Sequence, residues 1–266
     1  MAEPLPLVAY DTLEDQVEAL YRDGYVYLPN VLNGKEIAKL REQMDILEPR
    51  FESFDKHMQP EAHGYLNKVI NNAFNRHPLF LKFLDYAGVI EIAEATHGED
   101  CHCIGMTAWM TGPGRPDQKL HTDWLPLSLP ADVLADPRVR VPIFISTAHF
   151  YLDDLTAELG PTNFIPGSHL SGRSPDGETE WKGQTEKSIM CQAGDVVLFR
   201  SEVWHRGTAN TSKKTRYLLQ VHYAKRMITQ KYPPYLNRFQ FDPDILQQAT
   251  PRQLRLMGDH KKSNYD

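Results

Sequence analysis

The chain has 266 residues, of which 41% are hydrophobic and 24% charged, as is ordinary for a soluble globular protein. Its net charge of −6 and the lack of a basic tract argue against nucleic-acid binding, because nothing stands out to neutralise phosphates. No apolar stretch is long enough to cross a membrane, and the first residues lack the basic start of a secretory signal. Three cysteines cannot all pair. We therefore expect a cytoplasmic protein without a membrane partner.

The first hundred residues have helical patterns. Thr12 followed by Asp15 predicts a helix N-cap, and Gly24 predicts the end of that helix. A short strand is expected over 25–28, and a second helix from Asn33. Apolar spacing predicts further helices over 78–86 and 89–97.

From about residue 100 the pattern changes to short β-rich runs separated by Gly and Pro turns. The runs are 103–110, 141–152, 162–165, 189–191, 196–199 and 216–223. Closely spaced strands favour a barrel or jelly roll. The stretch 126–142 is predicted to be a loop near its mouth, and a last helix is expected at 251–257. We expect one domain over 1–266, with a helical part (1–100), a barrel (101–225) and a C-terminal arm (226–266).

Two histidines and one aspartate suggest a metal site. On a β-strand, the period of two would send His121 and Asp123 to the same face, and His205 would complete the set. Two histidines and a carboxylate on one side of a metal leave positions open, as non-haem Fe(II) oxygen chemistry requires. A His-x-Asp pair alone is weak evidence, because such pairs also occur by chance.

Arg216 strengthens this interpretation. Iron and dioxygen chemistry needs an electron-donating co-substrate, and 2-oxoglutarate would require a cationic partner for its distal carboxylate. Arginine binds a carboxylate in bidentate fashion and stays charged when buried. The run after Arg216 alternates as a barrel strand would, which would turn the arginine inward. A surface arginine paired with an acid is the competing interpretation.

Several segments together resemble the phytanoyl-CoA dioxygenase family. They are His121-Thr122-Asp123, the Gly-Pro-Thr-Asn-Phe-Ile-Pro-Gly-Ser-His run at 160–169, Ala-Gly-Asp at 193–195, His205 through Arg216, and Asp-Gly-Tyr-Val-Tyr-Leu-Pro-Asn-Val-Leu at 23–32. The resemblance implies a mainly β fold with flanking α-helices around a double-stranded β-helix, a jelly-roll and cupin-like core. It also implies that His121, Asp123 and His205 bind Fe(II) and that Arg216 holds 2-oxoglutarate.

Other positions follow from the resemblance with alternatives left open. Thr162 and Gln118 match residues that contact the co-substrate in relatives, although turn or strand-edge hydrogen bonding would also explain them. Lys68 matches a lysine that some relatives place in the pocket, and a solvated lysine is an equal alternative. Trp124 and His149 are candidate substrate contacts, with core packing as the alternative for Trp124.

Two further motifs are not assigned to the metal. His169 closes the family motif and is expected to stabilise a turn. Cys101-His102-Cys103 has no partner pair at zinc-site spacing, so buried thiols are expected there.

The expected reaction is the O2-dependent oxidation of a small molecule, most simply hydroxylation, with release of succinate and CO2. In related halogenases a small residue replaces the carboxylate ligand, so Asp123 argues against halogenation. Secondary metabolism is the expected setting. A cupin-like metal-dependent isomerase or binding protein, and a non-catalytic partner subunit of the same fold, are the alternatives. Neither the substrate nor the oligomeric state can be derived from the sequence.

Overall fold

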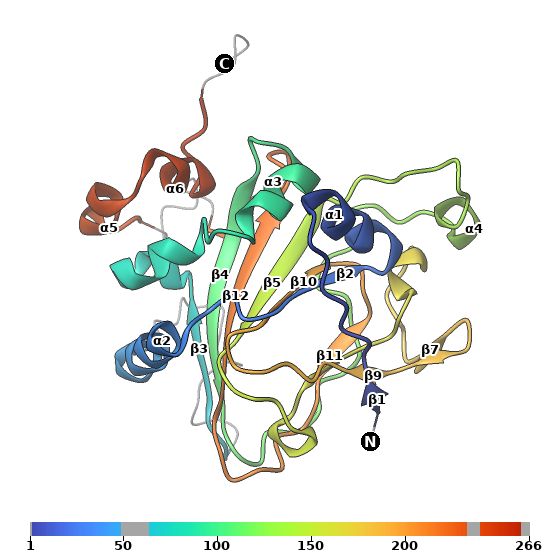
Figure 1. Ribbon diagram of the computed structural model, residues 1–266, viewed down its shortest axis with the longest axis horizontal. Coiled ribbons are helices and arrows are strands. Elements are labelled where there is room, and N and C mark those ends of the chain that lie inside the picture. Colours follow the sequence, from blue (N-terminus) through green and yellow to red (C-terminus); the bar gives the residue numbers. More distant parts are fainter. Residues whose placement is uncertain (1, 49–63, 233–239, 262–266) are drawn as a thin grey trace.

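The computed structural model describes residues 2–48, 64–232 and 240–261, and two β-sheets form its centre (Figure 1). The larger sheet has six strands in the order β2-β10-β5-β12-β4-β3, and the smaller has four in the order β1-β9-β6-β11. The strands are β1 (Glu3–Pro4), β2 (Tyr25–Leu28), β3 (Asn67–Asn71), β4 (His102–Thr111), β5 (Ile145–Tyr151), β6 (Thr162–Phe164), β7 (Glu180–Trp181), β8 (Gln184–Thr185), β9 (Lys187–Ser188), β10 (Val196–Arg200), β11 (His205–Gly207) and β12 (Arg216–Ala224).

The long strand β12 lies inside the larger sheet, between β4 and β5, and both pairings are antiparallel. Successive side chains on a strand alternate between faces. On β12, Arg216, Leu218 and Gln220 line a cavity between the sheets, whereas Leu219 and Val221 belong to the core on the other face. Both faces are therefore covered.

A compact apolar layer fills the space between the two sheets beside this cavity. It includes Phe164 from β6, Phe199 from β10 and Leu218 from β12. No strand pairing among the described residues joins the two sheets into a hydrogen-bonded, closed barrel. The arrangement is a jelly roll of two facing sheets, as predicted.

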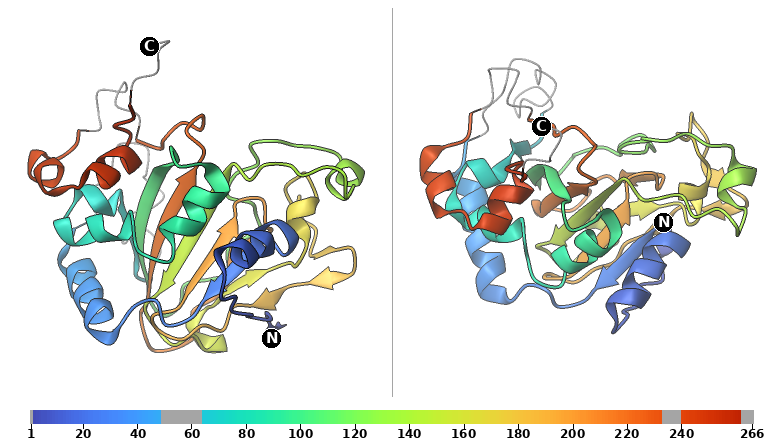
Figure 2. Two further views of the ribbon diagram at one scale, coloured as in Figure 1. Left: turned by 45° about the horizontal axis from the view of Figure 1, so that its top comes forward. Right: turned by 90° about the horizontal axis from the view of Figure 1, so that it is seen from above.

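Helices cover the outer face of the larger sheet, over a core that includes Leu40, Phe150 and Val221 (Figure 2). They are α1 (Leu13–Arg22), α2 (Gly34–Ile46), α3 (Ile90–His97), α5 (Pro243–Gln248) and α6 (Pro251–Leu256), with the 3₁₀ turns η3 (Ala73–Asn75) and η4 (Pro78–Phe83). Two further 3₁₀ turns, η5 (Ala157–Leu159) and η6 (Ser168–Leu170), precede and follow β6 in the chain. The C-terminal α5 and α6 lie beside η4, so the C-terminal arm packs against the N-terminal helical part.

Side-chain caps set the starts of α1, α2, α5 and α6. The Thr12 hydroxyl accepts from the Asp15 N–H, as predicted, and Asn33 forms a capping box with Glu36.

A buried carboxylate, Asp195, accepts from the Tyr27 hydroxyl at 2.8 Å and from the Asn30 N–H at 2.9 Å. These bonds attach the end of β2 to the turn before β10.

Several expected boundaries were wrong. The segment at 78–86 is a 3₁₀ helix over Pro78–Phe83, and only 145–151 of the run 141–152 is strand. The strand expected at 189–191 lies at Lys187–Ser188. The pattern missed β3 and the short β11, because neither carries an alternating apolar pattern of its own. Parts of the predicted arm at 226–266 lie outside the described residues.

The loop at 126–142 contains one helical turn, α4 (Ala131–Leu134). The Ser128 hydroxyl donates to the Gly172 carbonyl at 2.6 Å. Gly172 has φ +67°, and a side chain there would collide with the Leu129 carbonyl. The loop is therefore attached to the segment after η6 by a contact that only glycine allows.

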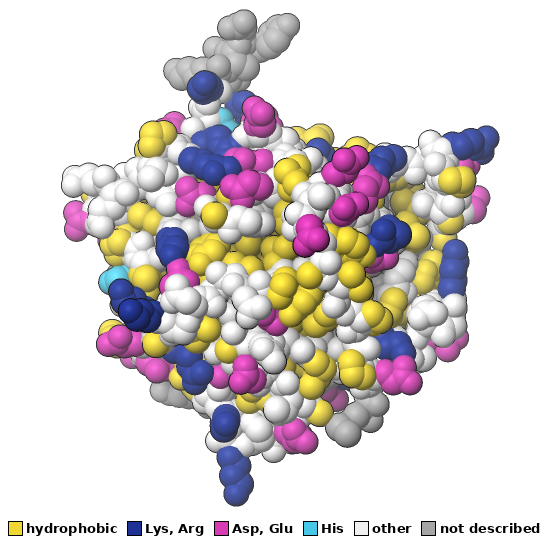
Figure 3. Space-filling view, viewed as in Figure 1, with side chains coloured by type: hydrophobic (Ala, Val, Ile, Leu, Met, Phe, Trp, Pro, Cys, Tyr) yellow, Lys and Arg dark blue, Asp and Glu magenta, His cyan; other side chains and the backbone are white. Residues whose placement is uncertain are grey.

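Basic and acidic side chains are interspersed on the face shown in Figure 3, around a central group of hydrophobic side chains. Within the described ranges, every helix is too short or too polar to traverse a lipid bilayer.

Candidate metal centre and co-substrate pocket

His121, Asp123 and His205 meet at one point between the sheets. Their ligand atoms lie within 4.8 Å of one another. Oδ1 of Asp123 is 3.6 Å from Nε2 of His205 and 3.9 Å from Nε2 of His121. The two imidazole rings are 4.5 Å apart between centroids. Two nitrogens and one carboxylate oxygen therefore converge as ligands of a single ion would.

The local backbone brings the ligands together differently from the prediction. His121 is not on a regular strand: it forms an isolated antiparallel bridge with His205, with N–H···O distances of 3.0 and 2.9 Å. The chain then bends, and the Asp123 N–H donates to the Ser201 carbonyl at 3.1 Å. The assumed period-two strand was wrong at Asp123, and the bridge and bend place both side chains on the same side instead.

Backbone carbonyls set the tautomers of both histidines. Nδ1 of His121 lies 2.8 Å from the Lys119 carbonyl, and Nδ1 of His205 lies 2.9 Å from the Val203 carbonyl. A carbonyl oxygen only accepts, so each Nδ1 carries the proton and each Nε2 presents a lone pair. Both Nε2 atoms point toward Asp123. This outer hydrogen bonding orients histidines that bind metals.

The electrostatics of the three groups also suit a cation. Burial opposes charge on Asp123, but the neighbouring His205 outweighs this effect and holds the pKa of Asp123 well below its usual range. Burial, followed by repulsion from His205, lowers the pKa of His121. For His205, burial acts against the charged form, but Asp123 raises its pKa above the ordinary value. The carboxylate therefore stays ionised.

A cavity of about 230 Å³ contains the three residues. Its lining combines the ligand set with charged, polar and apolar side chains from both sheets and the 111–118 segment. These residues are Trp109, Thr111, Arg115, Gln118, His121, Asp123, His149, Thr162, His205, Gly207, Arg216, Leu218 and Gln220.

Arg216 lies at the start of β12, is 7% exposed and lines the cavity. Its guanidinium donates to the Gly160 carbonyl, and its buried Nε has no hydrogen-bond partner. Burial, followed by the charge of Arg115, lowers its pKa to about 10. A buried guanidinium with an unsatisfied donor fits a carboxylate in the same cavity, which is what 2-oxoglutarate would supply.

A second buried arginine, Arg115, was missed by the sequence interpretation. Its guanidinium donates to the carbonyls of Gly207 and Thr208 at 3.1 and 3.3 Å. Arg115 follows the turn Gly112-Pro113-Gly114, and no local pattern indicates where that turn directs it. Together with Arg216 it makes this part of the cavity cationic.

The structure places the two other predicted co-substrate residues in the same cavity. Thr162 is 3% exposed and pairs with Gly207 across β6 and β11. The side-chain oxygen of Gln118 accepts from the Gly207 N–H at 2.8 Å. Both line the cavity and both also stabilise backbone, so each of the two interpretations has a structural basis.

His149 lies in a hydrogen-bonded row across the cavity. The Trp109 indole N–H donates to Oε1 of Gln220 at 2.7 Å, and Nε2 of Gln220 is 2.9 Å from Nε2 of His149. The amide nitrogen must donate, so His149 accepts at Nε2 and carries its proton on Nδ1, 3.4 Å from the Tyr151 hydroxyl. Burial lowers the pKa of His149 to about 3, which keeps it neutral.

Lys68 does not reach the cavity. It pairs with Met110 across β3 and β4, and directly opposed residues in a sheet point to the same face. Met110 belongs to the outer core, whereas its neighbours Trp109 and Thr111 line the cavity. Nζ of Lys68 instead donates to the Asp45 carbonyl at 2.8 Å. The register of β3 therefore turns Lys68 away from the metal ligands.

Trp124 also lies outside the cavity lining. Its ring packs edge-on against His222 with 5.3 Å between centroids, and it joins a small apolar cluster with Ile104 and Ile145.

The residues not assigned to the metal are buried elsewhere. His169 lies beneath Gly24, 3.3 Å from the Tyr21 carbonyl, and burial lowers its pKa to about 3. The thiols of Cys101 and Cys103 are buried, and burial raises their pKa.

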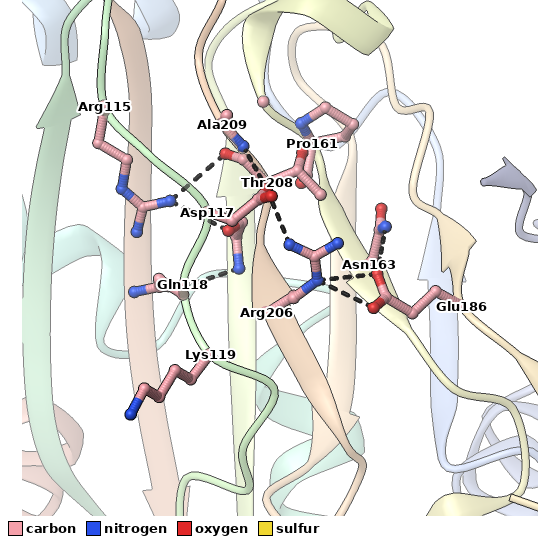
Figure 4. Close-up of polar contacts among 12 residues, drawn as sticks. Arg115, Asp117, Gln118, Lys119, Pro161, Asn163, Glu186, Arg206, Thr208 and Ala209 are labelled. Carbon is pink, nitrogen blue, oxygen red and sulfur yellow. Dashed lines mark hydrogen bonds and ion pairs between the residues drawn. The ribbon is translucent and has the colours of Figure 1, made fainter. Parts of the chain in front are cut away.

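A polar cluster on the outer side of β11 supports the site (Figure 4). Arg206, next to His205, points away from the metal ligands and forms ion pairs with Asp117 at 2.8 Å and Glu186 at 2.9 Å. Asn163 donates to the same Glu186 at 2.7 Å. The cluster ties β11 to the segment that carries Gln118 and His121.

Fold and site together have the features of an iron- and 2-oxoglutarate-dependent oxygenase: a jelly roll, a two-histidine, one-carboxylate cluster and a buried arginine in the same cavity. A sequence profile described as Phytanoyl-CoA dioxygenase (PhyH) matches residues 20–218 of the 266. The chain belongs to the phytanoyl-CoA dioxygenase family, which confirms the predicted dioxygenase class. The His121, Asp123 and His205 cluster could hold the expected metal ion.

Individual relatives are distant. Dioxygenase trt7 of Aspergillus terreus is 27% identical over 201 residues, which cover 72% of this chain and 61% of that protein. The epimerase SnoN from nogalamycin biosynthesis has a TM-score of 0.63 at 19% identity, covering 80% of this chain and 83% of SnoN. HygX from Streptomyces hygroscopicus, crystallised with nickel and 2-oxoglutarate, has a TM-score of 0.63 at 15% identity, covering 83% and 90%. At these identities the two structures are evidence of the shared fold.

Proposed function

We propose that this protein oxidises a small organic molecule, most simply by hydroxylation, while 2-oxoglutarate is converted to succinate and CO2. One observation carries the proposal: a two-histidine, one-carboxylate ligand set shares a cavity with a buried arginine whose Nε lacks a partner. The ligand set suits Fe(II), and the arginine suits the distal carboxylate of the co-substrate.

Each residue has a separate task. His121, Asp123 and His205 hold the iron, with the histidine tautomers set by the Lys119 and Val203 carbonyls. Bound iron, with 2-oxoglutarate and O2, supplies an oxidising power that amino-acid side chains lack. The protein contributes binding, orientation and exclusion of water.

Arg216 binds and orients the co-substrate through its distal carboxylate. Arg115 adds a second positive charge to the same part of the cavity, while its own hydrogen bonds to Gly207 and Thr208 keep it in place. Thr162 and Gln118 contribute shape and polar contacts beside these arginines.

Hydroxylation is the first choice because Asp123 occupies the position that a halide takes in related halogenases. The fold alone does not decide the outcome, since SnoN is named an epimerase. Placement of the substrate decides among hydroxylation, desaturation and rearrangement.

The substrate is proposed to be a medium-sized metabolite of a secondary pathway. SnoN is named for nogalamycin biosynthesis, and HygX has also been crystallised with hygromycin B. We retain a cytoplasmic location and one catalytic domain over 1–266 as part of the proposal.

Anaerobic addition of Fe(II) and then 2-oxoglutarate tests the proposal. The wild type should develop a weak visible charge-transfer band and, in air, release succinate slowly without substrate. Asp123→Ala and His205→Ala should lose both signals. His77→Asn is the control, because His77 caps η4 outside the cavity and asparagine can also cap. Succinate release by Asp123→Ala at the wild-type rate would refute the iron assignment.

The same titration separates the alternatives. A cupin-like isomerase or binding protein would bind the metal and show no response to 2-oxoglutarate. A non-catalytic partner subunit would release no succinate in air.

A further inference from the structure

A lysine on the side of the ligand set away from Arg216 has no assigned role. Arg216 and His222 both lie on β12, six residues apart, so their side chains face the same space between the sheets. At about 3.3 Å per residue, the two positions are about 20 Å apart. At the His222 end, the ring of Trp124 packs on His222, and Nζ of Lys231 lies 4.2 Å from the centre of that ring. Trp124 directly follows the metal ligand Asp123.

The backbone holds Lys231 in this position. Its N–H donates to the Ile104 carbonyl at 2.9 Å. The neighbours on either side, Gln230 and Tyr232, both donate side-chain hydrogen bonds to the Cys103 carbonyl, at 3.0 and 2.7 Å. Residues 230–232 are thus attached to the start of β4 by three hydrogen bonds.

Space for the lysine stem comes from Gly105. A Cβ at Gly105 would lie 3.1 Å from Cδ of Lys231 and 3.7 Å from Cδ2 of His222. Absence of a side chain at this point lets the stem cross β4 and reach Trp124. Lys231 as a whole residue is exposed to solvent, while its ammonium end lies over the Trp124 ring.

Among the described residues, the ammonium of Lys231 has no ion-pair partner within 4.0 Å. Burial of the ammonium lowers the pKa of Lys231, and attraction to Asp123 partly offsets that effect. In the proposed function, Asp123 binds the iron, so its charge is used there. The cation–π contact with Trp124 positions the charge without neutralising it.

The surroundings of Trp124 are apolar. Trp124, Phe144 and Ile228 pack against a cluster that includes Ile104 and Ile145. Met227, next to Ile228, is 76% exposed. Leu127, three residues after Trp124, is 41% exposed. A single positive charge on an aromatic platform with apolar neighbours fits an acidic group on an apolar molecule.

We propose that Lys231, resting on Trp124, binds an acidic group of the substrate, and that the substrate is a small organic acid with an apolar body. This inference rests on the proposed function, because it places the acid beside the metal ligand Asp123. It disfavours polycationic substrates, which the ammonium would repel.

The test measures binding of matched acids and amides by calorimetry. A panel of phenylalkanoates and medium-chain alkanoates, each with its neutral amide, is titrated into protein loaded with Ni(II) and saturating 2-oxoglutarate. The variants are Lys231→Met, which removes the charge, and Lys231→Arg, which keeps it. Lys182→Met is the matched control, because Lys182 lies over another ring, that of Trp181, at 5.5 Å. Trp181 belongs to β7, whereas Trp124 directly follows the metal ligand Asp123.

At least one acid should bind the wild type and Lys182→Met about 10- to 100-fold more tightly than its amide, as expected for a charge-assisted contact. Lys231→Met should lose this preference, and Lys231→Arg should retain most of it. Acids that bind Lys231→Met as tightly as the wild type, or a panel without any preference for acids, would overturn the proposal. So would acids that bind only by displacing 2-oxoglutarate.

Affinity for 2-oxoglutarate is measured separately in every variant, and the acid titration is repeated without 2-oxoglutarate. Lys231→Met should bind 2-oxoglutarate like the wild type. Failure of 2-oxoglutarate to bind the wild type would count against the proposed function, whereas an acid preference that ignores Lys231 counts only against this inference.

Discussion

Replacing Arg216 with methionine should weaken co-substrate binding while stabilising the protein without ligands. Arg216 is 7% exposed, and its Nε has no hydrogen-bond partner. A pKa of about 10 in place of 12.5 corresponds to about 3 kcal/mol against holding the charge in this position. Loss of the hydrogen bond to the Gly160 carbonyl destabilises the folded state by about 1 kcal/mol and offsets part of that gain. The free energy of unfolding should therefore rise by about 2 kcal/mol.

Binding should change in the opposite direction. A buried carboxylate that loses its charged partner costs about 3–5 kcal/mol, so the Kd for 2-oxoglutarate should rise by about 100-fold or more. Urea unfolding of the ligand-free protein measures the first effect. Calorimetry with Ni(II) and 2-oxoglutarate measures the second.

Arg200→Met is the matched control. Arg200 is 4% exposed, compared with 7% for Arg216, but it pairs with Glu202 at 3.4 Å and lies outside the cavity lining. Its loss leaves Glu202 buried without a partner, so this variant should be destabilised by about 3 kcal/mol and should keep its affinity for 2-oxoglutarate. If Arg216→Met were destabilised to the same extent, or bound 2-oxoglutarate normally, the role assigned to the unsatisfied guanidinium would be wrong.

Three further predictions concern stability. Burial lowers the pKa of His97 and His169 to about 3, so both stay neutral in the fold and take up protons on unfolding below about pH 6.5. The free energy of unfolding should have its full value above that pH and should fall by about 1.4 kcal/mol per pH unit for each histidine as the pH drops toward 3. Equal urea midpoints at pH 7 and pH 5 would contradict this. Gly172→Ala should cost about 2–4 kcal/mol through its positive φ and the collision with Leu129, whereas Gly177→Ala, with φ +87° and free space, should cost about 1 kcal/mol. Ni(II) with 2-oxoglutarate at 100 times its Kd should stabilise the wild type by about 2.7 kcal/mol and should not stabilise His121→Ala, as thermal unfolding would show.

The local chemistry of the chain was enough to predict the jelly roll, the clustering of His121, Asp123 and His205, and the inward position of Arg216 in the same cavity. Residue types carry this information, because the His-x-Asp pair and the strand period depend on a few neighbouring positions, and His205 stands in a segment that resembles the family motif. The prediction was less accurate where geometry depended on a partner segment. The bridge between His121 and His205, rather than a strand through Asp123, brings the ligands together.

Only the tertiary structure decided which other side chains surround the ligands. Lys68 faces away because β3 pairs with β4 in a register that sets it opposite Met110. Arg115 and Lys231 come from segments without a recognisable pattern, and their places depend on hydrogen bonds to Gly207 and Ile104. The sequence alone thus determined the chemistry of the centre, because that chemistry belongs to individual side chains. The shape and charge around it come from contacts between distant segments, and those exist only in the folded chain.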